Sequence, residues 1–325
     1  MAQGRSGSMS TEMKSTRDAY GECLVELGGD ERIVVLDADV STSTRTKKFA
    51  VKCPERFFNV GCAEQNLIAT AAGFAYGGKI AIATAYAIFA TARTWEQIRS
   101  FVAHDNLNVK IIATHAGLTN GPDGASHQSL EDIALLRVIP NMTVIVPADA
   151  EEAKQAILAA IEHPGPCYIR LSRAKSPVIF DSSYKFMLGK GAVLKDGQDL
   201  TIIAVGNMVV KAFEAAEILE KEGVSVRIVN LSTIKPIDRE IVSNAARETG
   251  AIVTVEEHNV IGGLGGAVAE VVSAEQPVPI EIVGVKDKFG QTGETDELYK
   301  VYDLTTEKVV EASKKALSRK KELGR

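Results

Sequence analysis

The 325-residue sequence has few residues of the kinds that mark secreted, zinc-binding or membrane proteins. It contains four cysteines with no CxxC pair and five histidines with no two at i, i+4 spacing, so neither a disulfide framework nor a metal site is indicated. No apolar run reaches the ~20 residues that span a bilayer. Basic residues are dispersed and the net charge is -5, which argues against nucleic-acid and membrane-surface binding. We therefore expect a cytoplasmic protein.

What is present is an alternation of short apolar runs with helical segments. Runs such as 32–36, 79–84 and 109–114 are mainly apolar and do not alternate with polar residues, which is typical of parallel strands covered on both faces. Between them, apolar residues recur at helical spacing over 13–28 and again over 86–102, which predicts helical structure in both segments. The sequence thus predicts an α/β protein with two three-layer domains built on parallel sheets, the second smaller than the first.

The domain boundaries follow from composition. Residues 1–12 are expected to be a disordered or tag-like start, because Met1–Met9 is polar and rich in Gly and Ser. The first domain is predicted over 13–180, a turn-rich linker over 181–195, and the second domain over 196–325.

The most informative stretch of the first domain is residues 59–75. Residues 59–75 read NVGCAEQNLIATAAGFA, an extended segment that breaks at Gly61 and becomes an Ala-rich helix with Glu64 near its start. Residues from Leu67 onward are small and apolar on every face, so the helix is expected to be buried. Taken alone, Glu64 is most simply a helix-initiating acid, since acids are favoured near helix N-termini.

Ligands of parallel sheets bind at the carboxyl ends of the strands, which selects the loops 37–44, 59–66, 115–129 and 172–176. The third loop holds His115, Asp123 and His127 among three glycines, and imidazole and carboxylate groups suit a polyhydroxylated substrate and proton transfer. After the next strand, Arg173 is a candidate for phosphate binding, whereas Arg170 is expected in a surface ion pair. We interpret the Gly-rich run 262–266 as close helix–strand packing rather than a nucleotide loop.

Together these motifs resemble the carboxyl-terminal half of transketolases, in particular the separately encoded C-terminal subunit of split transketolases. The resemblance covers about 13–317 and includes NVGCAEQNLIATAAGFA, THAGLTNGPDGASHQSLEDIA, YIRLSR and VEEHNVIGGLG. It implies a pyrimidine-binding domain followed by a transketolase C-terminal domain. It also implies transfer of a two-carbon ketol unit between sugar phosphates, as in the pentose phosphate pathway, with thiamine diphosphate as cofactor.

The resemblance assigns roles to individual residues. Glu64 would hydrogen-bond N1′ of the cofactor's aminopyrimidine and favour its imino tautomer, which deprotonates the thiazolium carbon. The other cofactor-binding residues would be Phe89, stacked on the pyrimidine, Tyr86 in the same pocket and Asp39 in a neighbouring loop. The substrate would contact His115, Asp123 and His127 at its hydroxyls and reacting end, with His127 also catalytic, and Arg17, Ser43 and Arg173 at its phosphate.

One expected part is missing. Transketolases hold the diphosphate through a metal in an amino-terminal domain with a GDG motif, and no such motif precedes residue 13. The resemblance therefore implies a separate N-terminal subunit that binds Mg²⁺ and shares the cofactor, with self-association into an α2β2 assembly. The alternatives are a 1-deoxyxylulose-5-phosphate synthase-like subunit, the E1 β-subunit of a 2-oxo acid dehydrogenase, and a non-catalytic assembly partner.

Overall fold

The computed structural model describes residues 11–181 and 183–324. Of the predicted disordered or tag-like start, residues 1–10 lie outside the described residues. Within the described part of the chain, no helix is both long and apolar enough to cross a membrane. The four cysteines are free, and Cys62 alone among them is exposed.

The first sheet has seven strands in the order β12-β6-β7-β5-β4-β2-β3. Every residue of β2, β4, β5 and β7 is buried, which explains the continuous apolar runs in the sequence. Neighbouring strands are parallel, except that β12 pairs antiparallel with β6 at the edge. The strands are β2 (Ile33–Asp37), β3 (Phe57–Asn59), β4 (Ile80–Thr84), β5 (Val109–Ala113), β6 (Thr143–Ile145), β7 (Cys167–Arg170) and β12 (Thr233–Lys235).

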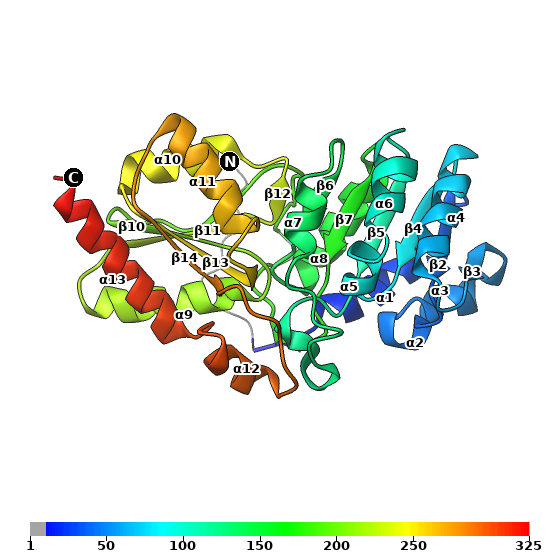
Figure 1. Cartoon of the computed structure of the whole chain (residues 1–325), viewed down its shortest axis with the longest axis horizontal. Helices are drawn as coiled ribbons and strands as arrows, with labels where there is room; N and C mark the ends of the chain where they lie inside the picture. The colour runs from blue at the N-terminus through cyan, green and yellow to red at the C-terminus, as the bar shows by residue number, and fades with distance from the viewer. Residues whose placement is uncertain (1–10, 182, 325) are drawn as a thin grey trace.

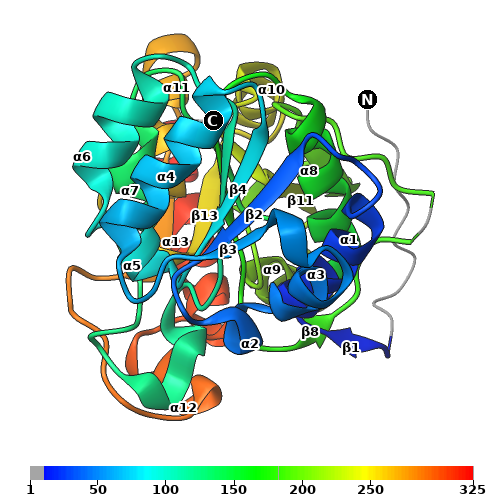
Figure 2. The ribbon, with the colours of Figure 1, turned by 90° about the vertical axis from the view of Figure 1, so that its right-hand side faces the viewer.

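Helices cover both faces of this sheet, with α4 and α6 on one side of β2 and β4 and α1, α3 and α8 on the other (Figure 2). Side-chain caps start two of them: Ser15 accepts a hydrogen bond from the Asp18 amide, and Asp149 accepts one from the Glu152 amide. The segments are α1 (Thr16–Leu27), α2 (Ser41–Thr44), α3 (Lys47–Lys52), η1 (Pro54–Arg56), α4 (Glu64–Tyr76), α5 (Ala87–Thr91), α6 (Trp95–Gln97), η2 (Ile98–Ala103), η3 (Leu118–Asp123), α7 (Asp132–Arg137) and α8 (Ala150–Glu162).

The segment 86–102 is largely helical, as its periodicity predicts, but it is not a single regular α-helix. The segment divides into α5, α6 and the π-helix η2. At the division, the hydroxyls of Thr91 and Thr94 each donate 2.7 Å hydrogen bonds to the carbonyl four residues earlier. Such back-bonding bends helices, and hydrophobic periodicity does not reveal it.

The second sheet has five strands in the order β14-β13-β10-β11-β9, with only β9 antiparallel. Helices α9 and α13 lie on one face, and α10 and α11 lie on the other (Figure 1). A short strand pair, β1 (Met13–Lys14) with β8 (Ser176–Pro177), stands apart. The elements are β9 (Ala192–Lys195), β10 (Leu200–Ala204), α9 (Met208–Lys221), β11 (Val226–Asn230), α10 (Arg239–Thr249), β13 (Ile252–Asn259), α11 (Leu264–Glu275), β14 (Ile280–Val285), α12 (Thr295–Val301) and α13 (Thr306–Glu322).

The two halves of the chain are packed into each other. One hydrophobic cluster runs without interruption from Leu67 and Ile111 in the first half to Val229 and Leu264 in the second. Strand β12 leaves the second half and pairs with β6, placing Thr233 opposite Ile145. The predicted α/β architecture with two helix-covered parallel sheets is confirmed, and the contact between its halves is more extensive than a linker would suggest.

Candidate active site

The carboxyl ends of β4 and β5 bring the loop 115–129 together with the segment that begins at Tyr86. Tyr86 follows β4 and His115 follows β5, and a bridge between Tyr86 and Thr114 extends this pairing past the strand ends. The rings of Tyr86 and His115 stack with centroids 3.9 Å apart. Phe89 meets His127 edge-on at 5.1 Å. The structure thus gathers four of the predicted residues into one aromatic cluster.

Glu64 is the first residue of α4 and is only 7% exposed. Its carboxylate accepts a 2.7 Å hydrogen bond from Nη1 of Arg93. The Arg93 guanidinium also lies over the Phe89 ring, with its central carbon 4.4 Å from the ring centroid. Glu64 and Phe89 therefore face one another across a single flat, charged group. Arg93 was not among the predicted residues, and its exposed position 29 residues from Glu64 carries no sequence signal.

His115 is buried and has a left-handed backbone, with φ of 60°. Its Nε2 lies 3.2 Å from Nη1 of Arg17, and its Nδ1 lies 2.7 Å from the Thr114 hydroxyl. A guanidinium can only donate, so Nε2 accepts and the ring proton is on Nδ1. Burial, together with the charge of Arg17, lowers the pKa of His115 to about 3. The imidazole is therefore neutral near pH 7.

Basic residues lie beside His115, with Arg17 in direct contact with its ring. Arg17 donates to the backbone carbonyl of Ser43 at 3.1 Å, so the predicted pair is in contact through the Ser43 main chain. The Nε of Arg17 is buried and has no hydrogen-bond partner among the described residues. Burial, followed by repulsion from Arg45, lowers the pKa of Arg17. The Arg17 guanidinium therefore has a donor that could bind an anion.

Arg173 and Asp123 face one another with Nη1 and Oδ2 3.6 Å apart, and each side chain is more than a third exposed. Arg173 also donates to the carbonyl of Asn120 at 3.2 Å. Asp39 is placed differently: it is exposed, has a left-handed φ of 64° and accepts a 2.8 Å hydrogen bond from Asn59. It thus lies at the ends of β2 and β3, and its side chain makes no contact with the aromatic cluster among the interactions of the described residues.

The second half of the chain holds the loop that carries His115, Asp123 and His127. The buried carboxylate of Glu257, on β13, accepts a 2.7 Å hydrogen bond from the Thr119 amide. Gly117 lies so close that a Cβ there would be 2.5 Å from the Glu257 carboxyl carbon. Further along the loop, Gln128 donates to the Gln291 carbonyl at 2.9 Å. The sequence did not suggest a role for Glu257, because an acid in a strand normally points to solvent.

Two expectations about charged and Gly-rich segments have different outcomes. Arg170 is not in a surface ion pair: its guanidinium is buried and donates to Asp132 at 2.7 Å, because the second half covers this edge of the first sheet. The Gly-rich run packs closely, as expected. The carboxylate of Glu256 accepts hydrogen bonds from the amides of Leu264 and Gly265, which closes the N-terminus of α11.

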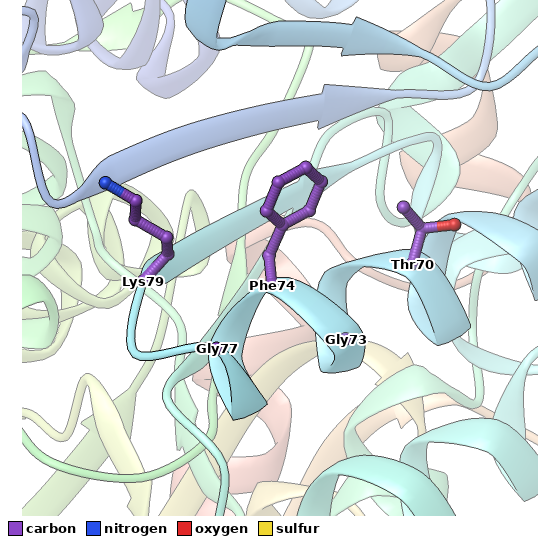
Figure 3. Close-up of a pocket in the computed structure, with 5 residues that line it drawn as sticks. All are labelled: Thr70, Gly73, Phe74, Gly77 and Lys79. Atoms are coloured by element: carbon purple, nitrogen blue, oxygen red, sulfur yellow. The ribbon is translucent and has the colours of Figure 1, made fainter.

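An open hollow of about 510 Å³ lies elsewhere on the surface. It is lined by Thr70, Gly73, Phe74, Gly77 and Lys79, at the other end of α4 from Glu64 (Figure 3). None of the predicted site residues lines it. Among the described residues, no three His, Cys, Asp or Glu side chains are placed to hold a metal ion together.

Comparison with known protein families shows which family the chain belongs to. Residues 12–178 match the pyrimidine-binding domain of transketolase, and residues 189–309 match the transketolase C-terminal domain. The chain belongs to the transketolase family. Family membership implies dependence on thiamine diphosphate, and the recognition made from the sequence motifs is confirmed.

Relatives of similar length carry transketolase names. The chain is 50% identical to a putative transketolase C-terminal section from Methanocaldococcus jannaschii, over 91% of this chain and 94% of that protein. It is 41% identical to a 6-deoxy-6-sulfo-D-fructose transketolase subunit from Clostridium sp., over 94% and 95%. A solved structure described as a split gene transketolase, inactive beta4 tetramer, superposes with a TM-score of 0.87 at 52% identity, covering 94% of this chain and 99% of that one.

Proposed function

We propose that this chain is the C-terminal subunit of a split transketolase, which transfers a two-carbon ketol unit from a ketose phosphate to an aldose phosphate. The observation that carries the proposal is the geometry of Glu64 and Phe89. A buried carboxylate and an aromatic face hold a flat N–H donor between them. An aminopyrimidine ring is also flat and hydrogen-bonds through ring nitrogen, so the pair fits one end of thiamine diphosphate.

The residues of this chain would bind and orient that ring. Glu64 would share a proton with its N1′ nitrogen, and Phe89 would stack on its face. Tyr86 would fill the space between Phe89 and His115, with which it makes ring contacts. Asp39 would approach from the loop after β2. When bound, thiamine diphosphate supplies the electron sink for breaking and forming the carbon–carbon bond.

The remaining cluster would bind the sugar phosphate. His115, which is neutral, and Asp123 would contact hydroxyl groups, with His115 Nε2 exchanging its present contact with Arg17 for the substrate. His127, which is part-exposed and in contact with the rings of Phe89 and Tyr86, would move a proton at the reacting end. Arg17, with its unpartnered buried Nε, would hold the terminal phosphate with Arg173 and the Ser43 segment. These groups suit a phosphorylated polyol better than an unphosphorylated 2-oxo acid.

The diphosphate and Mg²⁺ would be held by a separate N-terminal subunit, and two copies of each chain would form the α2β2 enzyme. The names of the relatives support this arrangement, since one is a C-terminal section and another a subunit. The solved tetramer made of one kind of chain is described as inactive.

The test is to mix the purified chain with an N-terminal subunit that carries a GDG motif and to assay ketol transfer from xylulose 5-phosphate to ribose 5-phosphate. Glu64→Gln should lower the rate by roughly 10²-fold or more, the range expected for loss of a proton-transfer group. The matched control is Glu96→Gln, which changes an exposed acid in the first turn of α6 and should leave the rate unchanged. Full activity of Glu64→Gln, or full activity of this chain alone, would refute the proposal.

A further inference from the structure

Arg93 contacts both Glu64 and Phe89, the two residues that the proposed function assigns to binding the cofactor ring. It lies between α5 and α6, and its guanidinium is placed between the Glu64 carboxylate, at the start of α4, and the Phe89 ring, on α5. Nη1 donates to Glu64 at 2.7 Å, and the guanidinium carbon is 4.4 Å from the centre of Phe89. The flat cation thus combines an aromatic contact on its face with a hydrogen bond from its edge.

The backbone of Arg93 is tied to the same helix as Glu64. Its carbonyl accepts a hydrogen bond from the Gln65 side chain at 3.3 Å, so the main chain stays beside the first turn of α4 when the side chain moves. The side chain itself is 50% exposed, whereas that of Glu64 is 8% exposed. Glu64 is therefore shielded from solvent, whereas the guanidinium has an open path to it.

We propose that Arg93 is a place-holder for the aminopyrimidine ring of thiamine diphosphate. Before the cofactor binds, the guanidinium partners the buried Glu64 carboxylate and keeps Phe89 facing it. When the ring enters, Arg93 swings toward solvent and the ring takes over both contacts. The inference rests on the proposed function, and it adds a residue that opposes cofactor binding while preserving the shape of the site.

The place-holder role follows from the cost of leaving the Glu64 carboxylate without a partner if Arg93 were absent. A buried charged carboxylate without a partner is costly, so the first turn of α4 would be strained or would rearrange. Arg93 supplies a partner, and the contact is weak enough to exchange because half of the arginine side chain remains in water. A lysine could provide the charge but not the flat face that lies on Phe89.

The experiment is to measure the affinity of thiamine diphosphate with Mg²⁺ for the assembly of this chain with its N-terminal partner, by titration calorimetry. Arg93→Met keeps an apolar stem over Phe89 and removes the charge and the hydrogen bond. Because the ring no longer displaces the guanidinium, binding should become about three- to ten-fold tighter, as expected for one half-exposed ion pair with a cation–π contact. Arg93→Lys should lie between the wild type and Arg93→Met.

The matched control is Arg99→Met, which removes an exposed arginine on η2 that forms no side-chain ion pair among the described residues; it should leave the affinity unchanged. A second readout is thermal unfolding of the chain without cofactor, where Arg93→Met should lower the midpoint because Glu64 loses its partner. An Arg93→Met affinity equal to or weaker than that of the wild type would overturn the place-holder role and leave the proposed function intact. Absence of cofactor binding by the wild-type assembly would overturn both.

Discussion

Substituting Gly117 by alanine tests whether the second half of the chain positions the substrate loop. Gly117 has φ of 75° and ψ of -168°, a region that is essentially restricted to glycine and costs other residues about 1–3 kcal/mol. The added Cβ would also lie 2.5 Å from the Glu257 carboxyl carbon. That carboxylate is buried and bound to the Thr119 amide, so it has little room to withdraw, and overpacking of this kind costs about 1–3 kcal/mol more.

Gly61→Ala separates the two contributions. Gly61 also has a positive φ, of 77°, but a Cβ there meets nothing within 4 Å, so this variant carries the cost of a positive φ without the clash. Denaturant unfolding should therefore show Gly117→Ala to be about 1–3 kcal/mol less stable than Gly61→Ala. Combining Gly117→Ala with Glu257→Asp, which withdraws the carboxyl by one methylene, should recover part of this loss.

The functional readout follows from what the loop carries. Displacing residues 117–127 moves Asp123 and His127 but not Glu64 or Phe89, which lie on other elements. In the reconstituted enzyme, Gly117→Ala should raise KM for the ketose phosphate and leave the affinity for thiamine diphosphate unchanged. If Gly117→Ala matched Gly61→Ala in stability and left KM at the wild-type value, the argument that Glu257 clamps the loop would be wrong.

Two further predictions concern protonation. Burial raises the pKa of Glu152 to about 7, so the folded state binds this proton more tightly than the unfolded chain, and the resulting stability is lost as pH rises from about 4.5 through 7. Glu152→Gln cannot titrate, so its free energy of unfolding relative to the wild type should rise by about 3 kcal/mol between those pH values; a difference independent of pH would contradict this. His115, whose pKa is lowered to about 3, should show no NMR titration of its ring carbon between pH 5 and 8, and a midpoint near 6.5 would contradict its burial beside Arg17.

Local signals explain what could be predicted from the sequence. Helix α8 (Ala150–Glu162) shows such signals, because its cap Asp149 and its apolar face are both encoded within a few residues. The place of His115 and His127 was also predictable, since loops after parallel strands meet at one sheet edge, whereas Tyr86 and Phe89 were expected in the site only from the family resemblance.

Long-range pairing explains what could not be predicted. Three hydrogen-bonded pairs show this: Arg93 with Glu64, Glu257 with Thr119, and Arg170 with Asp132. The two residues of each pair are between 29 and 138 positions apart in the sequence. In the sequence, each of these charged residues looks like a solvated side chain. Glu257 and Arg170 are buried because the two halves pack against each other. Arg93 and Glu64 pair within the first half, where α4 meets the segment between α5 and α6. Neither kind of contact has a periodic signature in the sequence.

Strand β12 has a consequence for how the protein is made. The first sheet ends at β6, and the strand that covers this edge, Thr233–Lys235, comes from the second half. An uncovered strand edge readily pairs with other chains. During synthesis, the first half emerges from the ribosome with β6 still open, and it stays open until residue 235 has left the exit tunnel. A fragment cut within residues 181–195 would keep that edge open permanently, so the first half would be prone to aggregate when produced without the second.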